Sequence, residues 1–312
     1  MKGDRFKPKK KGKKAQQKKS DRPLLVFVPG LTSHSLTPYV VHIVESFYNR
    51  GFDVAVINYR GLAGAKLNTP RLYTANATDD VREPIKWIYE KYIKQPAGSP
   101  IKEAPVVAMG CSLGASNLAN VLGDSNPNKR LPFLKAAMCM DVPMKFDRCL
   151  EILKSNLFGF FDIGLGANMV NQLKRHQKQV PETMKKMKDI YDIDLSEFLR
   201  NQKAIPSIIE YDKKITCPMF GYKNPKEYYD QASCARVVKN IQTPTLFFNC
   251  LGDPLVKSDG IAWDEIAENR NTMLCTTKFG GHIGYHQRTF DLNSQWFLDF
   301  CVDYFEGCLS NC

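Results

Sequence analysis

Short, largely apolar runs alternate along most of the chain with longer stretches in which apolar residues recur at helical spacing. The runs of strand length occupy residues 24–28, 53–57, 106–109, 136–140, 245–250 and 273–276. Strands that are apolar along their whole length are typical of a sheet that is covered on both faces. The pattern therefore predicts an α/β fold with a mostly parallel sheet flanked by helices.

The stretches between these runs have the spacing of amphipathic helices. Residues 39–48, 113–122 and 296–305 each place apolar side chains on one helical face. A further helix is expected to run through Trp87 and Tyr92, and the polar group formed by residues 78–80 (TDD) is predicted to cap its N-terminus.

This alternation breaks between residue 142 and about residue 232. The segment is helix-rich and basic, with methionine and aromatic residues spread through it, and the strand pattern resumes only at residue 245. Helices inserted over the C-terminal ends of parallel strands are typical of a lid over a binding cleft. We therefore predict a helical cap at about 142–232 within one domain spanning 21–312. A helical subdomain without a gating role is the alternative.

The net charge of +12 is concentrated at one end of the chain. Residues 2–19 contain ten lysine or arginine residues and one aspartate, a net charge of +9 that leaves +3 for the rest. Because this stretch has too few apolar residues to bury, we predict that residues 1–20 form a disordered tail. Its role is open between attraction to anionic lipids, a nuclear or nucleic-acid address, and solubilisation. The nearly neutral body gives no reason to expect nucleic-acid binding.

Cysteine usage and hydropathy indicate in which cellular compartment the protein is expected. Ten cysteines in 312 residues are too sparse for a small disulfide scaffold, and the charged N-terminus lacks the apolar stretch of a signal peptide. No cysteine and histidine spacing matches a zinc site, and no apolar run reaches the roughly 20 residues that cross a bilayer. We expect reduced thiols, a cytoplasmic location with peripheral membrane contact as an open alternative, and no metal or other cofactor. The oligomeric state is not specified.

The clearest chemical signal is the sequence Gly110-Cys111-Ser112-Leu113-Gly114, which follows an apolar strand and begins a helix. This G-x-S-x-G pattern is typical of a nucleophile elbow, in which serine sits on a strained strand-to-helix turn and the glycines remove clashing side chains. We therefore predict that Ser112 is a nucleophile at the N-terminus of a helix, where developing negative charge is favoured.

A serine nucleophile needs a base and an acid that orients the base. Of the five histidines, we choose His282, which stands in a glycine-rich loop between the last predicted strand and the last helix. His286 is the alternative base. Asp253, directly after the fifth strand, is the preferred acid, and Asp141, after the fourth, is the competing choice. The order Ser112, Asp253, His282 is the one found in α/β-hydrolases.

The negative oxygen of a tetrahedral intermediate needs two aimed N–H donors. The amide that follows the nucleophile, that of Leu113, supplies one. We predict that the amide of Leu31, in the loop after the first strand, supplies the other, because neighbouring Gly30 leaves room for the substrate.

Several short motifs occur in a characteristic order: residues 29–32 (PGLT), 58–64 (NYRGLAG), 69–73 (TPRLY), 78–80 (TDD), 110–114 (GCSLG), 220–222 (FGY), 228–233 (YYDQAS) and 280–284 (GGHIG). In these motifs the chain, from Leu24 onward, resembles the AB hydrolase family 4, and 220–222 and 228–233 look closest to its phospholipase-like animal members. The resemblance implies an α/β-hydrolase fold and supports Asp253 as the acid. Members commonly begin with a membrane anchor and a first pair of strands. For Arg60 and Arg71, we expect structural ion pairing.

Together these features predict a serine carboxylic-ester hydrolase that works through an acyl-enzyme intermediate. The resemblance implies medium-chain acyl esters, monoacylglycerols or phospholipids as substrates. Two alternatives stay open: an acyltransferase with the same triad, and a non-catalytic protein of this fold that binds lipids or steroids. The second normally lacks a triad member, and here none is missing.

Overall fold

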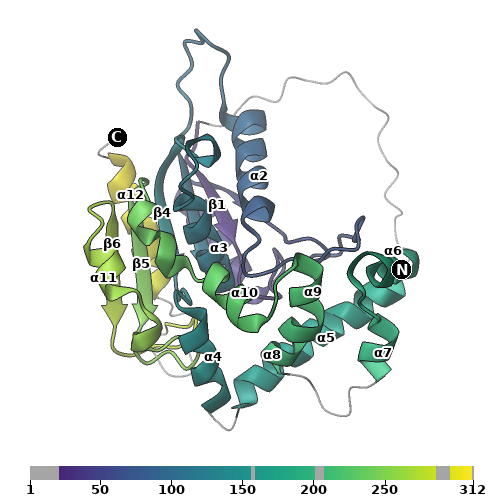
Figure 1. Ribbon diagram of the computed structural model, residues 1–312. Helices are drawn as coiled ribbons and strands as arrows, with labels where there is room; N and C mark the ends of the chain where they lie inside the picture. Colours follow the sequence, from purple (N-terminus) through teal and green to yellow (C-terminus); the bar gives the residue numbers. More distant parts are fainter. Residues whose placement is uncertain (1–20, 156–158, 201–206, 286–295, 311–312) are drawn as a thin grey trace, which may run out of the picture.

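A computed structural model describes residues 21–155, 159–200, 207–285 and 296–310 (Figure 1). Its centre is a sheet of six parallel strands in the order β2-β1-β3-β4-β5-β6. The strands are β1 (Leu24–Val28), β2 (Asp53–Val56), β3 (Val106–Cys111), β4 (Leu134–Met140), β5 (Thr245–Cys250) and β6 (Thr272–Thr277). The predicted α/β fold with a parallel sheet is confirmed, and all six expected strands are present.

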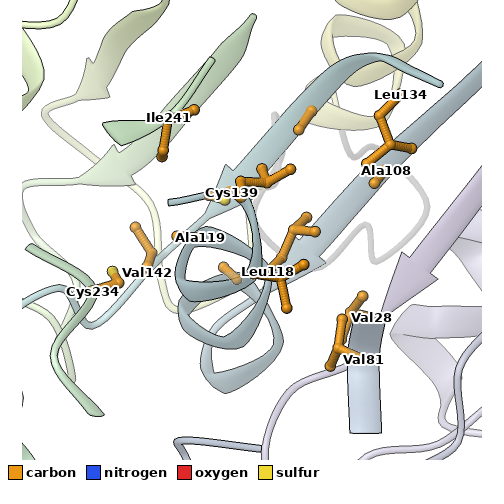
Figure 2. Close-up of a cluster of buried hydrophobic side chains, with 14 of the residues drawn as sticks. Val28, Val81, Ala108, Leu118, Ala119, Leu134, Cys139, Val142, Cys234 and Ile241 are labelled. Carbon is orange, nitrogen blue, oxygen red and sulfur yellow. The ribbon is translucent and has the colours of Figure 1, made fainter. Parts of the chain in front are cut away.

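Both faces of the sheet are covered by helices, which explains why the strands are apolar along their length. In β1, Val26 and Val28 face a cluster that includes Val81 of α2 (Thr78–Ile88) and Leu118 of α3 (Leu113–Leu122). Figure 2 shows Val28, Val81 and Leu118 together in this cluster. The short elements η5 (Cys234–Asn240) and α11 (Trp263–Ala267) complete that face.

The opposite face of β1 carries Leu25 and Phe27, which alternate with the valines as a strand requires. They pack against Phe47 of α1 (Pro38–Asn49) and Phe305 of α12 (Trp296–Ser310). Three further short elements are η1 (Tyr89–Ile93), whose Ile93 joins the cluster on the α2 and α3 face, η2 (Pro127–Lys129) and η6 (Ser258–Gly260).

The expected capping of α2 by its polar first turn is wrong. The N-cap position is Ala77, and no side chain caps the helix. The two acidic residues instead form ion pairs: Asp80 with Arg60, and Asp79 with Arg82, whose side chain is only 1% exposed and also binds Asp124 at 2.7 Å. The charge requirement of buried arginine outweighs the local capping preference. Arg60 therefore has the structural ion pairing that was expected of it.

Between β4 and β5 the chain forms a group of helices at one end of the sheet, which we call the cap (Figure 1). It has its own apolar core, in which Leu173, Met187 and Ile215 are almost fully buried, and Leu67 and Leu72 from the loop after β2 join that core. Its elements are α4 (Phe146–Ser155), α5 (Phe160–Gln179), α6 (Pro181–Tyr191), α7 (Leu195–Arg200), α8 (Ile208–Tyr211), η4 (Asp212–Thr216), α9 (Cys217–Phe220) and α10 (Pro225–Ala232).

The strand order reverses direction beside β1, since β2 lies on one side of it and β3 on the other. In open parallel sheets, ligands bind outside the carboxyl ends of the strands at such a switch point. The loops after β1 and β3 therefore meet where a site is expected. No helix among the described residues has the length and apolar character that crossing a membrane requires.

Candidate active site

Ser112 occupies the sharp turn between β3 and α3. Its backbone has φ 52° and ψ −123°, a strained combination for a residue with a side chain. A Cβ atom at Gly110 would lie 2.6 Å from the Gly114 carbonyl oxygen, and one at Gly114 would lie 2.1 Å from the Val28 carbonyl oxygen. Both glycines are therefore required by space, and the elbow that the sequence predicts is present.

His282 lies on the loop after β6 and connects two of the predicted residues. Its Nε2 atom is 2.8 Å from the Ser112 Oγ, and its Nδ1 atom is 2.7 Å from Asp253 Oδ2. Asp253 is fully buried, and its other oxygen accepts the amides of Leu255 at 2.7 Å and Val256 at 3.2 Å. These amides fix the carboxylate so that Oδ2 faces the imidazole.

The surroundings of His282 favour its protonated form. Burial opposes a charge on the ring, but the hydrogen bond and charge of Asp253, with the charge of Asp141, outweigh burial and raise the pKa of His282. An imidazole that gains a proton from a neighbouring hydroxyl is stabilised in this environment.

Asp141, the competing acid, makes different contacts. It follows β4 with φ 45°, and its Oδ2 atom accepts the Ile283 amide at 2.7 Å. Its Oδ1 atom accepts the Tyr285 hydroxyl and, at 3.4 Å, the Cys250 amide. Burial raises the pKa of Asp141 to about 6. Asp141 thus holds the loop that carries His282, while Asp253 contacts the imidazole itself.

Asp141, Asp253 and His282 are also the one group in the described part of the chain whose ligand atoms lie close enough together for a cation, all within 4.8 Å. Each of the three is already committed to a hydrogen bond within the site, and the His282 Nδ1 atom in particular is taken by Asp253. The arrangement is better suited to moving a proton between Ser112 and His282 than to holding a metal.

The loop after β1 lies against the serine, since a Cβ atom at Gly30 would be 3.3 Å from the Ser112 Cβ. The amide of Gly30 donates to the Tyr39 hydroxyl at 2.9 Å, and that of Thr32 donates to the Tyr73 hydroxyl at 3.0 Å. The Leu31 amide between them has no acceptor among the described residues.

The Leu113 amide is the first of α3, where intrahelical acceptors are lacking. Leu31 and Leu113 both line the same cavity as Ser112. The two predicted donors therefore lie beside Ser112, and neither amide has an acceptor in the part of the chain that the structure describes.

That cavity, of about 230 Å³, lies between the sheet edge and the cap, and it includes both Ser112 and His282 in its wall. Most of its other lining is apolar and comes from the cap, as with Leu150, Leu165 and Met169. An apolar cavity with a few convergent polar groups is the usual form of a small-molecule site.

The other histidines do not compete with His282 in the described part of the chain. His34 and His42 do not line the cavity. His176 does line it, but burial, with the charge of Arg175, lowers the pKa of His176 to about 4. His286, the alternative base, and the basic tail of residues 1–20 lie outside the described residues.

Sequence reasoning missed the tyrosines around the loop after β1. Tyr73 is half-buried, stacks on Tyr59 with ring centroids 4.8 Å apart, and belongs to the motif 69–73. Its place in that motif was the only available signal. Arg71, for which ion pairing was expected, instead stacks over the Phe220 ring at 4.9 Å.

Comparison with known proteins agrees with this geometry. A family model described as the alpha/beta hydrolase fold matches residues 23–289. The chain is 30% identical to an abhydrolase domain-containing protein of Dictyostelium discoideum over 94% of this chain and 69% of that protein. It is 31% identical to phospholipase ABHD3 of Bos taurus (85% and 59%) and 29% identical to a monoacylglycerol lipase of Saccharomyces cerevisiae (85% and 55%).

The chain therefore spans between 55% and 69% of the length of these relatives. Among solved structures, an esterase of Pyrococcus furiosus superposes with a TM-score of 0.54 at 15% identity, covering 94% of this chain and 82% of that one. At this identity the likeness concerns the fold.

Proposed function

Because the chain belongs to the α/β-hydrolase fold family, we propose that it is a serine carboxylic-ester hydrolase that works through an acyl-enzyme intermediate. The observation that carries this proposal is the chain of hydrogen bonds from Asp253 through His282 to Ser112, together with the position of Ser112 in the wall of an apolar cavity. Serine, histidine and aspartate in this order of contacts are the standard means of activating a hydroxyl for acyl transfer.

In the first half-reaction, the Ser112 Oγ attacks the ester carbonyl carbon and its proton passes to His282 Nε2. Asp253 stabilises the resulting imidazolium through Nδ1 without taking the proton itself. The Leu31 and Leu113 amides donate to the oxygen that becomes negative, and removal of one such donor typically costs roughly 3 kcal/mol of barrier. Collapse of the intermediate expels the alcohol, which takes the proton from His282.

In the second half-reaction, water enters where the alcohol left. His282 Nε2 removes one proton from it, the oxygen attacks the acyl carbon, and the proton then returns to the Ser112 oxygen as the acid departs. An alcohol in place of water gives ester synthesis by the same steps. One relative of this chain, 28% identical, is a medium-chain fatty acid ethyl ester synthase/esterase, so acyl transfer is the second candidate activity.

We propose lipid esters as the substrates: medium-chain acyl esters, monoacylglycerols or phospholipids. The apolar lining of the cavity supports an acyl chain as the bound group, since each buried methylene contributes about 0.8 kcal/mol. The names of the relatives, a monoacylglycerol lipase and a phospholipase, support the same class.

We also propose that the protein is cytoplasmic and meets its substrate at a membrane surface. Residues 2–19 carry a net charge of +9, and each basic residue near an anionic bilayer contributes about 1 kcal/mol of attraction. Several such contacts together hold a domain reversibly at the surface where lipid esters reside.

A fluorophosphonate probe tests the central proposal, because it labels an activated serine whatever the substrate. The wild-type chain is expected to be labelled and to hydrolyse p-nitrophenyl octanoate, while Ser112→Ala loses both. Ser116→Ala is the matched control, since Ser116 is buried one turn further along α3. Label retained by Ser112→Ala would reject Ser112 as the nucleophile and assign the activated serine elsewhere. Absence of label from the wild type would reject the hydrolase and favour a non-catalytic lipid-binding protein.

A further inference from the structure

Few of the side chains that line the cavity can carry a charge. No lysine or arginine lines it among the described residues. Besides His282, the only aspartate, glutamate or histidine residues in its described lining are Asp212 and His176. His176 is 2% exposed and uncharged at neutral pH, since burial lowers its pKa to about 4. Asp212 is therefore the one side chain in the described wall, away from the triad, that can bring a full negative charge to the ligand.

Asp212 has no basic partner within the described part of the chain. It begins η4, is 3% exposed, and accepts the Thr216 hydroxyl at 2.6 Å and the Tyr229 hydroxyl at 2.8 Å. Burial, with the nearby charge of Asp162, raises the pKa of Asp212 to about 7. A buried carboxyl group held by two neutral hydroxyls retains an unmet attraction for a cation.

Tyrosines surround the same part of the cavity. Tyr73, Tyr211, Tyr228 and Tyr229 all line it, and the rings of Tyr228 and Tyr229 lie with centroids 5.2 Å apart. Aromatic faces carry negative potential and attract quaternary ammonium groups, most strongly where water is excluded. The carboxyl group and the aromatic rings therefore both attract a positively charged ligand and both disfavour a negatively charged one.

We propose that Asp212 is a specificity-determining residue that makes the cavity select its ligands by charge. For one acyl chain, an ester whose alcohol carries a quaternary ammonium group is preferred over an uncharged ester, and the uncharged ester over an anionic one. This proposal rests on the proposed function because it takes the cavity as the site where the ester binds. It adds a preference for the charge that the substrate carries.

Binding to the Ser112→Ala chain tests the charge preference without turnover. Octyltrimethylammonium, 1-octylglycerol and octyl sulfate, each below the concentration at which it forms micelles, are titrated by calorimetry at pH 8, above the pKa of about 7 to which burial raises Asp212. We expect affinity to fall in that order. Equal affinities, or tighter binding of the sulfate, would overturn the proposal without any further variant.

Adding Asp212→Asn to this chain assigns the preference to one side chain. Asparagine keeps the size of the residue and removes its charge, so the ratio of cation to anion affinity should fall at least about tenfold. Asp162→Asn is the matched control: Asp162 is also buried and accepts the Ile208 amide at 2.8 Å, but it does not line the cavity. An unchanged ratio in the Asp212→Asn protein, or an equal fall in the control, would assign the selectivity elsewhere.

Turnover separates this proposal from the proposed function. The ratio of kcat/KM for octanoylcholine to that for 1-octanoylglycerol is compared between wild type and Asp212→Asn, because the intrinsic reactivities of the two esters cancel in the comparison. The ratio should fall about tenfold in the variant. If the ligands bind in the expected order of charge but no ester is hydrolysed, the hydrolase is rejected and the charge selectivity is retained. If esters are hydrolysed but the ratio is the same in wild type and variant, the hydrolase is retained and the role of Asp212 in selectivity is rejected.

Discussion

Replacing Asp253 by asparagine isolates the role of the acid, because the substitution changes no volume. The side-chain oxygen of asparagine can still accept the Leu255 and Val256 amides that bind Asp253 Oδ1. Its NH₂ group then faces His282 Nδ1, where the 2.7 Å contact now exists. Nδ1 must become an acceptor, so the ring proton moves to Nε2 and faces the Ser112 hydroxyl.

An imidazole with its proton on Nε2 cannot take another from serine. Loss of the correct tautomer in a serine triad lowers kcat by about 10⁴, which corresponds to about 5.4 kcal/mol at 1.36 kcal/mol per tenfold change. We expect this loss in Asp253→Asn with little change in KM.

Asp141→Asn is the matched comparison, since the two aspartates end neighbouring strands and are both fully buried. Asparagine at 141 can still accept the Ile283 amide, and the Tyr285 hydroxyl can reorient towards the new NH₂ group. We expect a loss of activity of about tenfold and a destabilisation of about 1–3 kcal/mol from the weakened buried hydrogen bonds.

Both substitutions should also shift the pH profile, and Asp253→Asn should shift it further, because Asp253 raises the pKa of His282 through a hydrogen bond as well as through its charge. Activity needs neutral His282, so it falls as the pH drops through the pKa of His282. The charge of Asp141 helps to raise that pKa; its removal should move the acid limb of kcat/KM to lower pH. Rates with p-nitrophenyl octanoate from pH 5 to 9, with thermal melts as a check on folding, measure both effects. A larger loss in Asp141→Asn than in Asp253→Asn would transfer the role of the acid to Asp141.

Three further predictions concern the elbow, the loop after β1 and the tail. Gly114→Ala places a methyl group 2.1 Å from a β1 carbonyl oxygen and should cost more than about 3 kcal/mol of stability, whereas Gly307→Ala, with open space around it in α12, should add about 0.5–1 kcal/mol in chemical denaturation. Tyr73→Phe leaves the Thr32 amide without its acceptor and should lower kcat about tenfold while KM stays constant in steady-state assays; a change confined to KM would contradict a positioning role. A chain that begins at Asp21 should lose co-sedimentation with phosphatidylserine vesicles, and raising salt to about 1 M should release the full chain, whereas equal binding by both chains would exclude the tail as the anchor.

The sheet could be predicted because its signal is local. Each strand is a short, largely apolar run, and in the four inner strands β1, β3, β4 and β5 burial on both faces leaves no competing helical periodicity. The capping of α2 could not be predicted in the same way. Whether Asp79 and Asp80 cap a helix or pair with Arg82 and Arg60 depends on contacts that form only when distant segments meet.

The site shows the same division. Ser112 was predictable because strand, turn, helix and two glycines are all encoded within a few residues. Asp253 and Asp141 could not be separated with certainty, since both end adjacent strands at equal reach of the histidine. The backbone amides of Leu255 and Val256, which hold Asp253 in position, are visible only in the folded chain. Asp212 carries no sequence signal, because its importance comes from the absence of a cation among its described neighbours.

The segment 72–76 connects the parts of the molecule that local patterns could not relate. Leu72 enters the core of the cap, and the Tyr73 hydroxyl accepts the Thr32 amide in the loop beside Ser112. The next carbonyl, that of residue 74, accepts Asn117 of α3 at 3.2 Å.

The Ala75 amide in the same segment donates to the Tyr228 hydroxyl of the cap at 2.9 Å. Residues 72–75 thus contact the cap, the loop after β1 and helix α3 without belonging to a helix or strand. Three motifs that are far apart in the sequence, 69–73, 110–114 and 228–233, supply residues that pack together here: Tyr73, Leu113 and Tyr228.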